Sequence, residues 1–504
     1  MKFLEKVLSL GLYLLAFLLP LQTRLFIRPG ELNGGYFEYG TISIYGTDIL
    51  LIFLVGIFYL SLRAQRSSLG FGSPNQRSPR SLRSLAMTGL LIGLNLVSLI
   101  SIFFAGDKLV AMQAYIRLTL GMGLFFVISR ATYNYLKLIY AFLAGAVVQA
   151  SLGIWQFLAQ ATFASKWLGL AAHPAEVGGS SVIETLDGGR WLRAYGGLDH
   201  PNVFGGFLSV SLLLIVYLML RNETGKKISN FQIQISNKIQ NPKSKIQNYV
   251  FYSLFLILLT ALFFTFSRGA WAGFIAGSII ILVFKLWQRD KSSLRQLFTL
   301  AAASAVLVSV LFINYQDLAT TRLSNNARLE IKSNLERTAS YKDGIAIIKD
   351  RWLVGVGIGG YTLALVKLYP AEPSWFYQPT HNTFLLVFAE TGIVGLILFI
   401  CIIGFLLISN DELLISNRIL NDQLPDEVSN KPYFWKLIRN LKLEIRNWFR
   451  TKRNFYKLPI IIALVVMMLA DHYYWSLHFG VLFFWFLLGL AARIEKAEHT
   501  SPPF

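Results

Sequence analysis

Charged residues are scarce in this sequence, and cysteine is almost absent. Only 15% of the 504 residues are charged and 54% are hydrophobic, whereas about a quarter of a soluble domain is charged. The shortage of charge and the repeated apolar runs of about 18 or more residues exclude a soluble protein and predict one that crosses a membrane many times. Short alternating segments are lacking, which favours helices over a β-barrel. The single Cys401 excludes a disulfide within the chain.

The apolar runs predict an all-α protein with about twelve transmembrane helices in one integral membrane domain, residues 1–504. The first run follows Lys2 and Lys6 and lacks a small-residue cleavage site, so we expect a retained helix rather than a signal peptide. The predicted spans cover approximately residues 6–22, 45–62, 86–104, 110–129, 138–159, 202–220, 250–266, 270–287, 297–314, 382–408, 458–474 and 479–493.

Lysine and arginine are concentrated in the segments that follow the even-numbered spans. Cytoplasmic segments of membrane proteins carry this excess, so the pattern predicts that both termini are cytoplasmic. Two of these segments, 221–249 and 409–457, are polar and basic, and we interpret them as cytoplasmic insertions. The net charge of +20 is then a signal of topology and of contact with anionic membrane lipids, and not of nucleic-acid binding.

The same topology places two long segments outside the cytoplasm. These are residues 160–201 and residues 315–380, the second of which separates the ninth and tenth spans and contains Arg322, Arg328 and Arg337. A single arginine there can be an ordinary solvated side chain. The set favours an anionic ligand, because guanidinium groups bind phosphate oxygens and keep their charge.

A glycine cluster, Gly355-Val-Gly-Ile-Gly-Gly360, follows a predicted helix with an apolar face at residues 341–353. The cluster literally matches a dinucleotide-binding fingerprint, but that motif requires a strand before it and a helix after it. A tight turn that lets the backbone approach a helix or a substrate is the better interpretation.

Further polar residues lie at or inside the predicted membrane boundary. Arg268 joins the seventh and eighth spans with almost no loop. A charge there is costly and is usually paired or functional, although an arginine can also extend to the lipid headgroups. Arg117 lies within the fourth span and can pair with Glu390, bind a phosphate or serve the structure alone. His200 and Asn202 flank the start of the sixth span, where they can cap the helix or help to bind an anion.

His381 opens the tenth span directly after the arginine-rich segment, and Asn382 follows and can orient it. A histidine at a helix start is often only a polar interface residue, but imidazole is also the side chain best suited to act as a general base near neutral pH. The sequence has no HExxH, no Asp-x-Asp, no Cys/His cluster at metal-ligand spacing and no P-loop. It therefore predicts no metal, no cofactor and no use of ATP.

The ordered set of motifs resembles the O-antigen ligase family, within a wider group that includes O-antigen polymerases. The resemblance extends over about residues 190–400. Its pieces are Tyr195-Gly-Gly-Leu-Asp-His-Pro-Asn202, Ser267-Arg-Gly-Ala270, Arg337 followed by Tyr341, the glycine cluster, and His381-Asn-x9-Gly392-x-x-Gly395. The last piece fits the ligase pattern at every fixed position.

The resemblance implies a metal-independent, inverting membrane glycosyltransferase of the C type in the bacterial inner membrane, with a periplasmic active site. The implied donor is a polyprenyl-diphosphate-linked glycan. The implied acceptor is a hydroxyl of a glycan or of a lipid-linked glycan such as the lipid A core, as in lipopolysaccharide and surface polysaccharide assembly. By resemblance, Arg268 and Arg337 bind the diphosphate and His381 activates the acceptor hydroxyl.

The large outer segment departs from the ligase pattern at one motif. Many ligases have Arg-x3-Leu there, and none of the four arginines of residues 315–380 has a leucine four residues later. Arg337 is the best match by its position, with Arg322 and Arg328 as substitutes. The departure favours a polymerase or transfer to another acceptor, including protein. A transporter or flippase of lipid-linked glycans is the alternative from a different class, and would favour broken helices and charges at the bilayer midplane.

Overall fold

The structure is a computed structural model, and it describes residues 2–68, 82–185, 188–232, 242–324, 328–407 and 452–500. The predicted insertion at 409–457 lies almost entirely outside the described residues, as do residues 233–241 of the insertion at 221–249.

Each of the twelve predicted spans coincides with a helix, and the all-α class is confirmed. The helices are α1 (Lys2–Leu18), α2 (Gly46–Ser68), α3 (Leu82–Ser101), α4 (Lys108–Arg130), α5 (Tyr135–Ala159), α6 (Pro201–Gln232), α7 (Pro242–Thr265), α8 (Arg268–Trp287), α9 (Lys291–Asn314), α13 (Thr383–Leu407), α16 (Lys452–Ala470) and α18 (His478–Thr500). Within the described ranges, nine of them are long and apolar enough to cross a membrane. The protein is therefore a multi-pass membrane protein, while the count of twelve spans stays a prediction.

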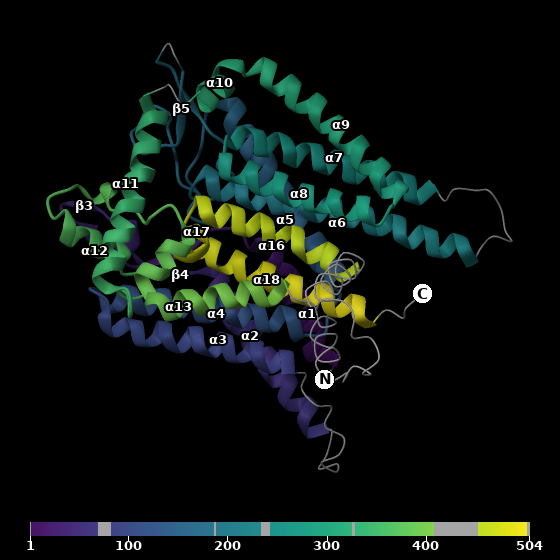
Figure 1. Ribbon diagram of the computed structural model, residues 1–504, viewed down its shortest axis with the longest axis horizontal. Helices are drawn as coiled ribbons and strands as arrows, with labels where there is room; N and C mark the ends of the chain where they lie inside the picture. The colour runs from purple at the N-terminus through teal and green to yellow at the C-terminus, as the bar shows by residue number, and fades with distance from the viewer. Residues whose placement is uncertain are drawn as a thin grey trace, which may run out of the picture.

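The elements that join these helices gather at one end of the molecule, on the left of Figure 1, and α1 begins and α18 ends at the other end. The strands pair as antiparallel hairpins, β1 with β4, β2 with β3 and β5 with β6. Their bounds are β1 (Arg24–Arg28), β2 (Glu31–Leu32), β3 (Gly35–Tyr36), β4 (Ile42–Tyr45), β5 (Val182–Glu184) and β6 (Arg190–Leu192). The helices at this end are the long α11 (Arg328–Arg351) and the shorter η1 (Glu38–Gly40), η3 (Ile102–Phe104), α10 (Gln316–Ser324), α12 (Tyr361–Leu368), η4 (Ser374–Phe376) and α17 (Tyr473–Ser476).

This end of the molecule contains both segments that the sequence placed outside the cytoplasm. It also contains a third segment, residues 23–45, which the sequence did not single out. The arrangement agrees with two termini on one side of the membrane. Which side is the cytoplasm stays a prediction.

Helix α6 lies at the centre of the bundle, and its apolar window is buried throughout. It packs against α5, α7, α8 and α16. A helix that is apolar on all sides can occupy this place, and small residues let its neighbours approach closely. A Cβ atom at Gly205 would lie 2.8 Å from the Cβ of Ala270. This close contact brings the first turn of α6 beside the first turn of α8.

The glycine cluster forms a tight turn after α11, as predicted. Gly355, Gly357 and Gly359 all have positive φ angles, and a Cβ at Gly355 would lie 2.4 Å from backbone atoms of Glu390. The preceding helix is longer than predicted, and its apolar face is narrower because Ile345 is exposed.

Helix α13 is interrupted at Gly392, which has φ 70° and ψ −175°. The glycine turn closes the break, since the N–H of Val356 donates to the carbonyl oxygen of Ala389 and the N–H of Ile393 donates to that of Trp352. Broken helices are tolerated at membrane depth when their backbone groups are satisfied by protein in this way.

Candidate active site

His381 and Asp471 meet where two helices end at the outer side of the bundle. His381 lies just before α13, Asp471 follows α16 directly, and α13 packs against α16. The Nδ1 atom of His381 is 3.9 Å from Oδ1 of Asp471, longer than a hydrogen bond but close enough for strong electrostatic interaction. The His381 side chain is 28% exposed. An imidazole beside a carboxylate and open to one side is the arrangement of a general base.

Hydrogen bonds between side chains and the backbone hold His381 and Asp471 in place. Asn382 caps α13, as its Oδ1 accepts from the N–H groups of Phe384 and Leu385 at 3.0 and 3.1 Å. The Asn382 amide also donates to the Leu469 carbonyl oxygen at 3.3 Å. Thr383 donates to the carbonyl oxygen of Asp471 at 2.7 Å. Asn382 therefore ties the start of α13 to the end of α16, which supports its predicted part in orienting His381.

Hydrogen bonds that run from Arg193 through Asn202 hold the carboxylate of Asp471. Asn202 donates from Nδ2 to Asp471 Oδ2 at 3.0 Å, and its Oδ1 accepts from Arg193 at 2.9 Å. Arg193 is buried and also donates to the carbonyl oxygen of Thr265 at 2.7 Å. Asn202, predicted to bind substrate, is thus seen to position Asp471.

His200 behaves as a helix cap, one of the two roles predicted for it. Its Nδ1 accepts from the N–H of Asn202 at 3.1 Å, in the first turn of α6. Burial, and then the charge of Arg193, lower the pKa of His200 to about 3. The ring is therefore neutral at physiological pH.

His472 completes a cluster with His381 and Asp471, and one ligand atom from each of the three lies within 4.8 Å of the others. The rings of the two histidines are 5.5 Å apart, and Nδ1 of His472 is 2.7 Å from Ser476 Oγ. Two imidazoles and a carboxylate are ligands that suit zinc. The sequence predicted no metal, and it could not reveal this cluster because His381 is far from the other two residues in the chain.

The electrostatics of the cluster favour an ionised carboxylate beside a neutral His472. Burial raises the pKa of Asp471, but the interaction with His381 and the nearby imidazoles of His472 and His200 outweigh it and hold that pKa below its usual value. Burial lowers the pKa of His472 to about 4. Asp471 is therefore negative over the whole physiological range.

Two of the predicted arginines share one buried carboxylate. Arg322 forms an ion pair with Glu330, and its Nε donates to the carbonyl oxygen of Phe266 at 3.1 Å. Arg268, the first residue of α8, lies 3.6 Å from Glu330 and donates to Asn334 at 3.2 Å. Both guanidinium groups are therefore held against α11.

Arg337 differs from these because its buried Nε has no hydrogen-bond partner among the described residues. It lines a hollow of about 230 Å³ together with Asn202, Asp471, the N-cap Ser267 of α8, and Gly269 and Ala270 in the first turn of that helix. Free N–H groups at a helix start carry partial positive charge. The structure thus brings Arg337 and the acid of the histidine cluster to one cavity.

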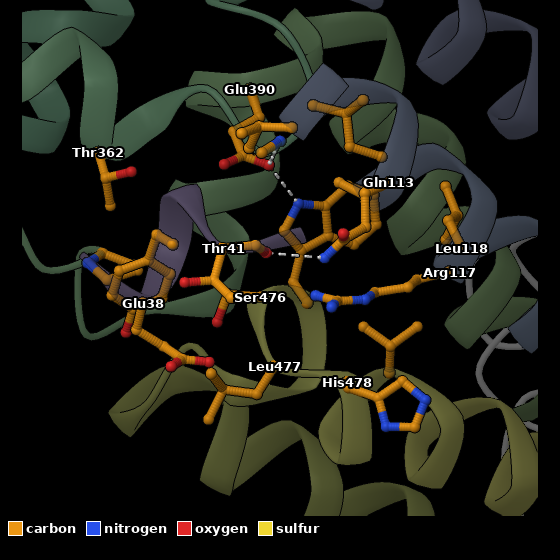
Figure 2. Close-up of a pocket in the computed structure, with 18 of the residues that line it drawn as sticks. Glu38, Thr41, Gln113, Arg117, Leu118, Thr362, Glu390, Ser476, Leu477 and His478 are labelled. Atoms are coloured by element: carbon orange, nitrogen blue, oxygen red, sulfur yellow. Dashed lines mark hydrogen bonds between the residues drawn. The ribbon is translucent and has the colours of Figure 1, made fainter. Parts of the chain in front are cut away.

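Arg328 and Arg117 lie elsewhere. Arg328 pairs with Glu184 at 2.7 Å on the exposed surface, nine residues and therefore about 13 Å along α11 from Arg337. Arg117 lines a separate pocket, shown in Figure 2, and its Nη2 is 3.5 Å from Ser43 Oγ. No ion pair joins Arg117 to Glu390 in the described structure, because Glu390 accepts instead from Gly359 N–H and the Trp475 indole, both at 2.8 Å.

Sequence reasoning missed Asp471, His472 and Arg193. The first two lie inside residues 458–474, which were counted as one apolar span. The helix α16 ends at Ala470 instead. An Asp-His pair at the end of an apolar run was the available signal, because ionisable residues at membrane depth are expensive and usually functional.

Residues 253–400 match the family model described as O-Antigen ligase. No curated protein matches the chain. The match covers less than a third of the sequence and contains Arg268, Arg337 and His381, whereas Asn202 and Asp471 lie outside it. The resemblance read from the motifs is confirmed over this stretch, and it supports a function of the O-antigen ligase or polymerase type in polysaccharide assembly.

Proposed function

We propose that this protein transfers a glycan from a polyprenyl-diphosphate carrier to an acceptor hydroxyl on the periplasmic side of the bacterial inner membrane. The observation that carries the proposal is the hollow in which the unpartnered guanidinium of Arg337 and the first turn of α8 face Asp471. Arg337 and the start of α8 suit a diphosphate, and Asp471 on the other wall supports His381 as a base.

The diphosphate binds at the positive wall of the hollow. Arginine and helix N-termini are the usual partners of phosphate oxygens in proteins. Arg337 provides an Nε without a hydrogen-bond partner in the described structure, and Gly269 and Ala270 bring the first turn of α8 to the same wall. Arg268 begins that turn, with its guanidinium at Glu330 and Asn334. These groups stabilise the negative charge that grows on the diphosphate as the bond to the sugar breaks.

The acceptor hydroxyl is activated by His381. Its proton passes to the imidazole while its oxygen bonds to the anomeric carbon, and the electron pair of the sugar–phosphate bond leaves with the diphosphate. Asp471, 3.9 Å away, stabilises the imidazolium that forms. A single displacement inverts the anomeric carbon and needs no protein nucleophile.

Proteoliposomes test the proposal with a polyprenyl-diphosphate-linked oligosaccharide carrying a fluorescent label and with acceptors of three kinds. These are the lipid A core, a second copy of the lipid-linked oligosaccharide and a hydroxyl-bearing protein. A new glycosidic bond, detected by gel shift and mass, is expected with the parent protein and not with His381→Ala or Arg337→Ala.

Lys332→Ala is the matched control, because Lys332 is an exposed cation on the same helix as Arg337. Equal transfer by the parent and by both active-site variants would refute the site. A ladder of repeats identifies a polymerase, and a single addition to the core or protein identifies a ligase. Movement of labelled lipid across the vesicle without any new bond would identify a transporter instead.

A further inference from the structure

A second and larger cavity, of about 860 Å³, lies within the bundle beside the histidine cluster. Its walls come from η1 and β4, from α4, from α12 and α13, and from α17 and the start of α18 (Figure 2). This volume counts all of the space between the lining atoms and includes open solvent.

The polar groups of this cavity differ from those of the arginine-lined hollow. Three carboxylates, of Glu38, Asp199 and Glu390, line it with one guanidinium, of Arg117. Glu38 is paired with Arg24, so Asp199 and Glu390 remain beside Arg117, a set less suited to a diphosphate because like charges at close range repel. Hydroxyl groups fit it well, since each can donate to a carboxylate and accept from a guanidinium.

Arg117 has few partners for a buried cation. Its Nη2 lies 3.5 Å from Ser43 Oγ and its guanidinium lies 5.5 Å from the centre of the Tyr45 ring. Among the described residues, its buried Nε has no hydrogen bond and no carboxylate lies within ion-pair distance. Figure 2 shows the guanidinium extending into the space bounded by Glu38, Ser476 and Glu390. A buried cation without an acidic partner is costly at membrane depth and marks a functional site by default.

Asp199 also lines the cavity. The residue is exposed, and no side-chain hydrogen bond is seen for it within the described structure. Burial, and then the charge of Glu38, raise the pKa of Asp199 to about 6. The carboxylate is therefore mostly ionised at neutral pH and can accept hydrogen bonds.

Aromatic side chains provide the apolar part of the wall. Tyr39, Tyr45 and Trp475 all line the cavity. Aromatic rings offer a flat apolar face with a polar group at the edge, and a sugar ring has apolar C–H faces with hydroxyls at its rim. The combination of rings, carboxylates and a guanidinium matches a glycan better than a lipid chain.

Residues that line the cavity contact the histidine cluster. Ser476 and Tyr39 line it, and Ser476 is hydrogen-bonded to His472, whose ring lies 6.4 Å from that of Tyr39. Pro379, two residues before His381, is part of the same wall. The cluster therefore lies between the arginine-lined hollow, which Asp471 lines, and this cavity, which Ser476 lines.

We infer that the cavity binds the terminal, hydroxyl-rich sugar of the acceptor glycan, with Arg117 and Asp199 as its hydrogen-bonding partners. The inference rests on the proposed transfer reaction and adds the place of the acceptor to it. The hollow then takes the anionic carrier of the donor, the cavity takes the acceptor, and His381 receives the proton of the acceptor hydroxyl between them.

A binding experiment tests the cavity without requiring transfer. The full chain in detergent is titrated by calorimetry with two carrier-free probes, the oligosaccharide released from the lipid-linked donor and the delipidated core oligosaccharide. At least one probe is expected to bind the parent, and Arg117→Gln and Asp199→Asn are expected to weaken that binding tenfold or more. Inorganic diphosphate is not expected to displace the sugar.

Two matched controls separate the cavity from general effects of charge. Arg130→Gln removes a cation from the same helix α4, and Asp317→Asn removes an exposed carboxylate on α10. Both should bind the probe as the parent does, and melting temperatures should show that all variants are folded. Absence of binding by the parent, or binding unchanged in both cavity variants, would overturn the inference.

Kinetics then separate failure of the inference from failure of the proposed function. With saturating donor, Arg117→Gln and Asp199→Asn should raise the acceptor KM tenfold or more and change the donor KM less than twofold. If the parent transfers glycan and the acceptor KM does not respond, the function stands and the acceptor site is wrong. If the parent binds sugar in the cavity but forms no glycosidic bond with any acceptor, the proposed transfer reaction is wrong and the proposal of a sugar-binding cavity stands.

Discussion

Asp471→Asn is the most informative change in the candidate active site. It removes the negative charge 3.9 Å from His381 Nδ1 while it keeps the size of the side chain. The carboxylate accepts from Asn202 at 3.0 Å and from the N–H of His472 at 2.9 Å, and the single oxygen of asparagine can keep only one of these bonds. The variant therefore tests the charge provided that its melting temperature shows the fold to be intact.

The expected loss follows from the distance. Two unit charges about 4 Å apart attract by about 4 kcal/mol at the effective dielectric constant of a partly buried site. His381 is 28% exposed, so solvent screens part of this, and we take about 3 kcal/mol for the stabilisation of the imidazolium. Because each 1.4 kcal/mol is tenfold in rate, kcat should fall about 100-fold.

The assay is glycan transfer in proteoliposomes, with kcat and the two KM values measured separately. The donor and acceptor KM should change little, because the charge acts when the proton arrives on His381 and not when the substrates bind. Asp317→Asn is the isosteric control on the outer surface.

Retention of kcat within threefold of the parent would refute the role given to Asp471. A rise in donor KM with unchanged kcat would refute it as well, since the carboxylate would then act in binding. A melting temperature equal to that of the parent is needed for either conclusion to hold.

The remaining predictions concern the donor, the metal, the fold and pH. Arg337→Ala should lower kcat/KM for the donor at least 100-fold, through loss of a charge-assisted contact, and Lys332→Ala less than twofold. EDTA should leave transfer within twofold, whereas a loss restored by zinc would show that the histidine cluster holds a metal. Gly392→Ala should destabilise by about 2 kcal/mol or more, because only glycine adopts this conformation readily and a Cβ would lie 2.0 Å from the Leu353 carbonyl oxygen; the melting temperature in detergent checks it. The pKa of His472 is about 4 in the folded protein against an ordinary 6.5. The unfolded chain therefore binds more protons as pH falls between these values, and the protein loses about 3 kcal/mol of stability. The difference in melting temperature between pH 7 and pH 4 should be smaller for His472→Gln than for the parent.

The spans could be predicted because hydrophobicity is a local property of the chain. Every predicted run coincides with a helix, and the glycine cluster forms the turn expected from its composition. The hairpins of residues 23–45 could not be predicted in the same way. Their strands are two to five residues long, too short for an alternating pattern to stand out.

The site could be predicted only in part, since its halves come from distant regions. His381 was identified because a histidine at a helix start after an arginine-rich segment suits a general base, and Arg337 by its resemblance to a family motif. Their relation to Asp471 depends on the packing of α13 against α16, and a sequence does not show which helices are neighbours. The part of Asn202 was hidden for the same reason, because it connects Arg193 to Asp471 across three segments.

Resemblance alone ranked Arg337 above Arg322 and Arg328 in the sequence, and in the structure one acid distinguishes these arginines physically. Glu330 is buried, pairs with Arg322 and lies 3.6 Å from Arg268. Arg337 follows Glu330 by seven residues, two turns of α11, so both point to the same side of the helix, yet no acid is paired with Arg337 in the described part of the chain. A cation that already has a carboxylate partner must give it up to bind phosphate, whereas an unpaired one gains by binding. The best candidate for the diphosphate contact is therefore the arginine that lacks a partner, and a count of arginines in the sequence could not have identified it.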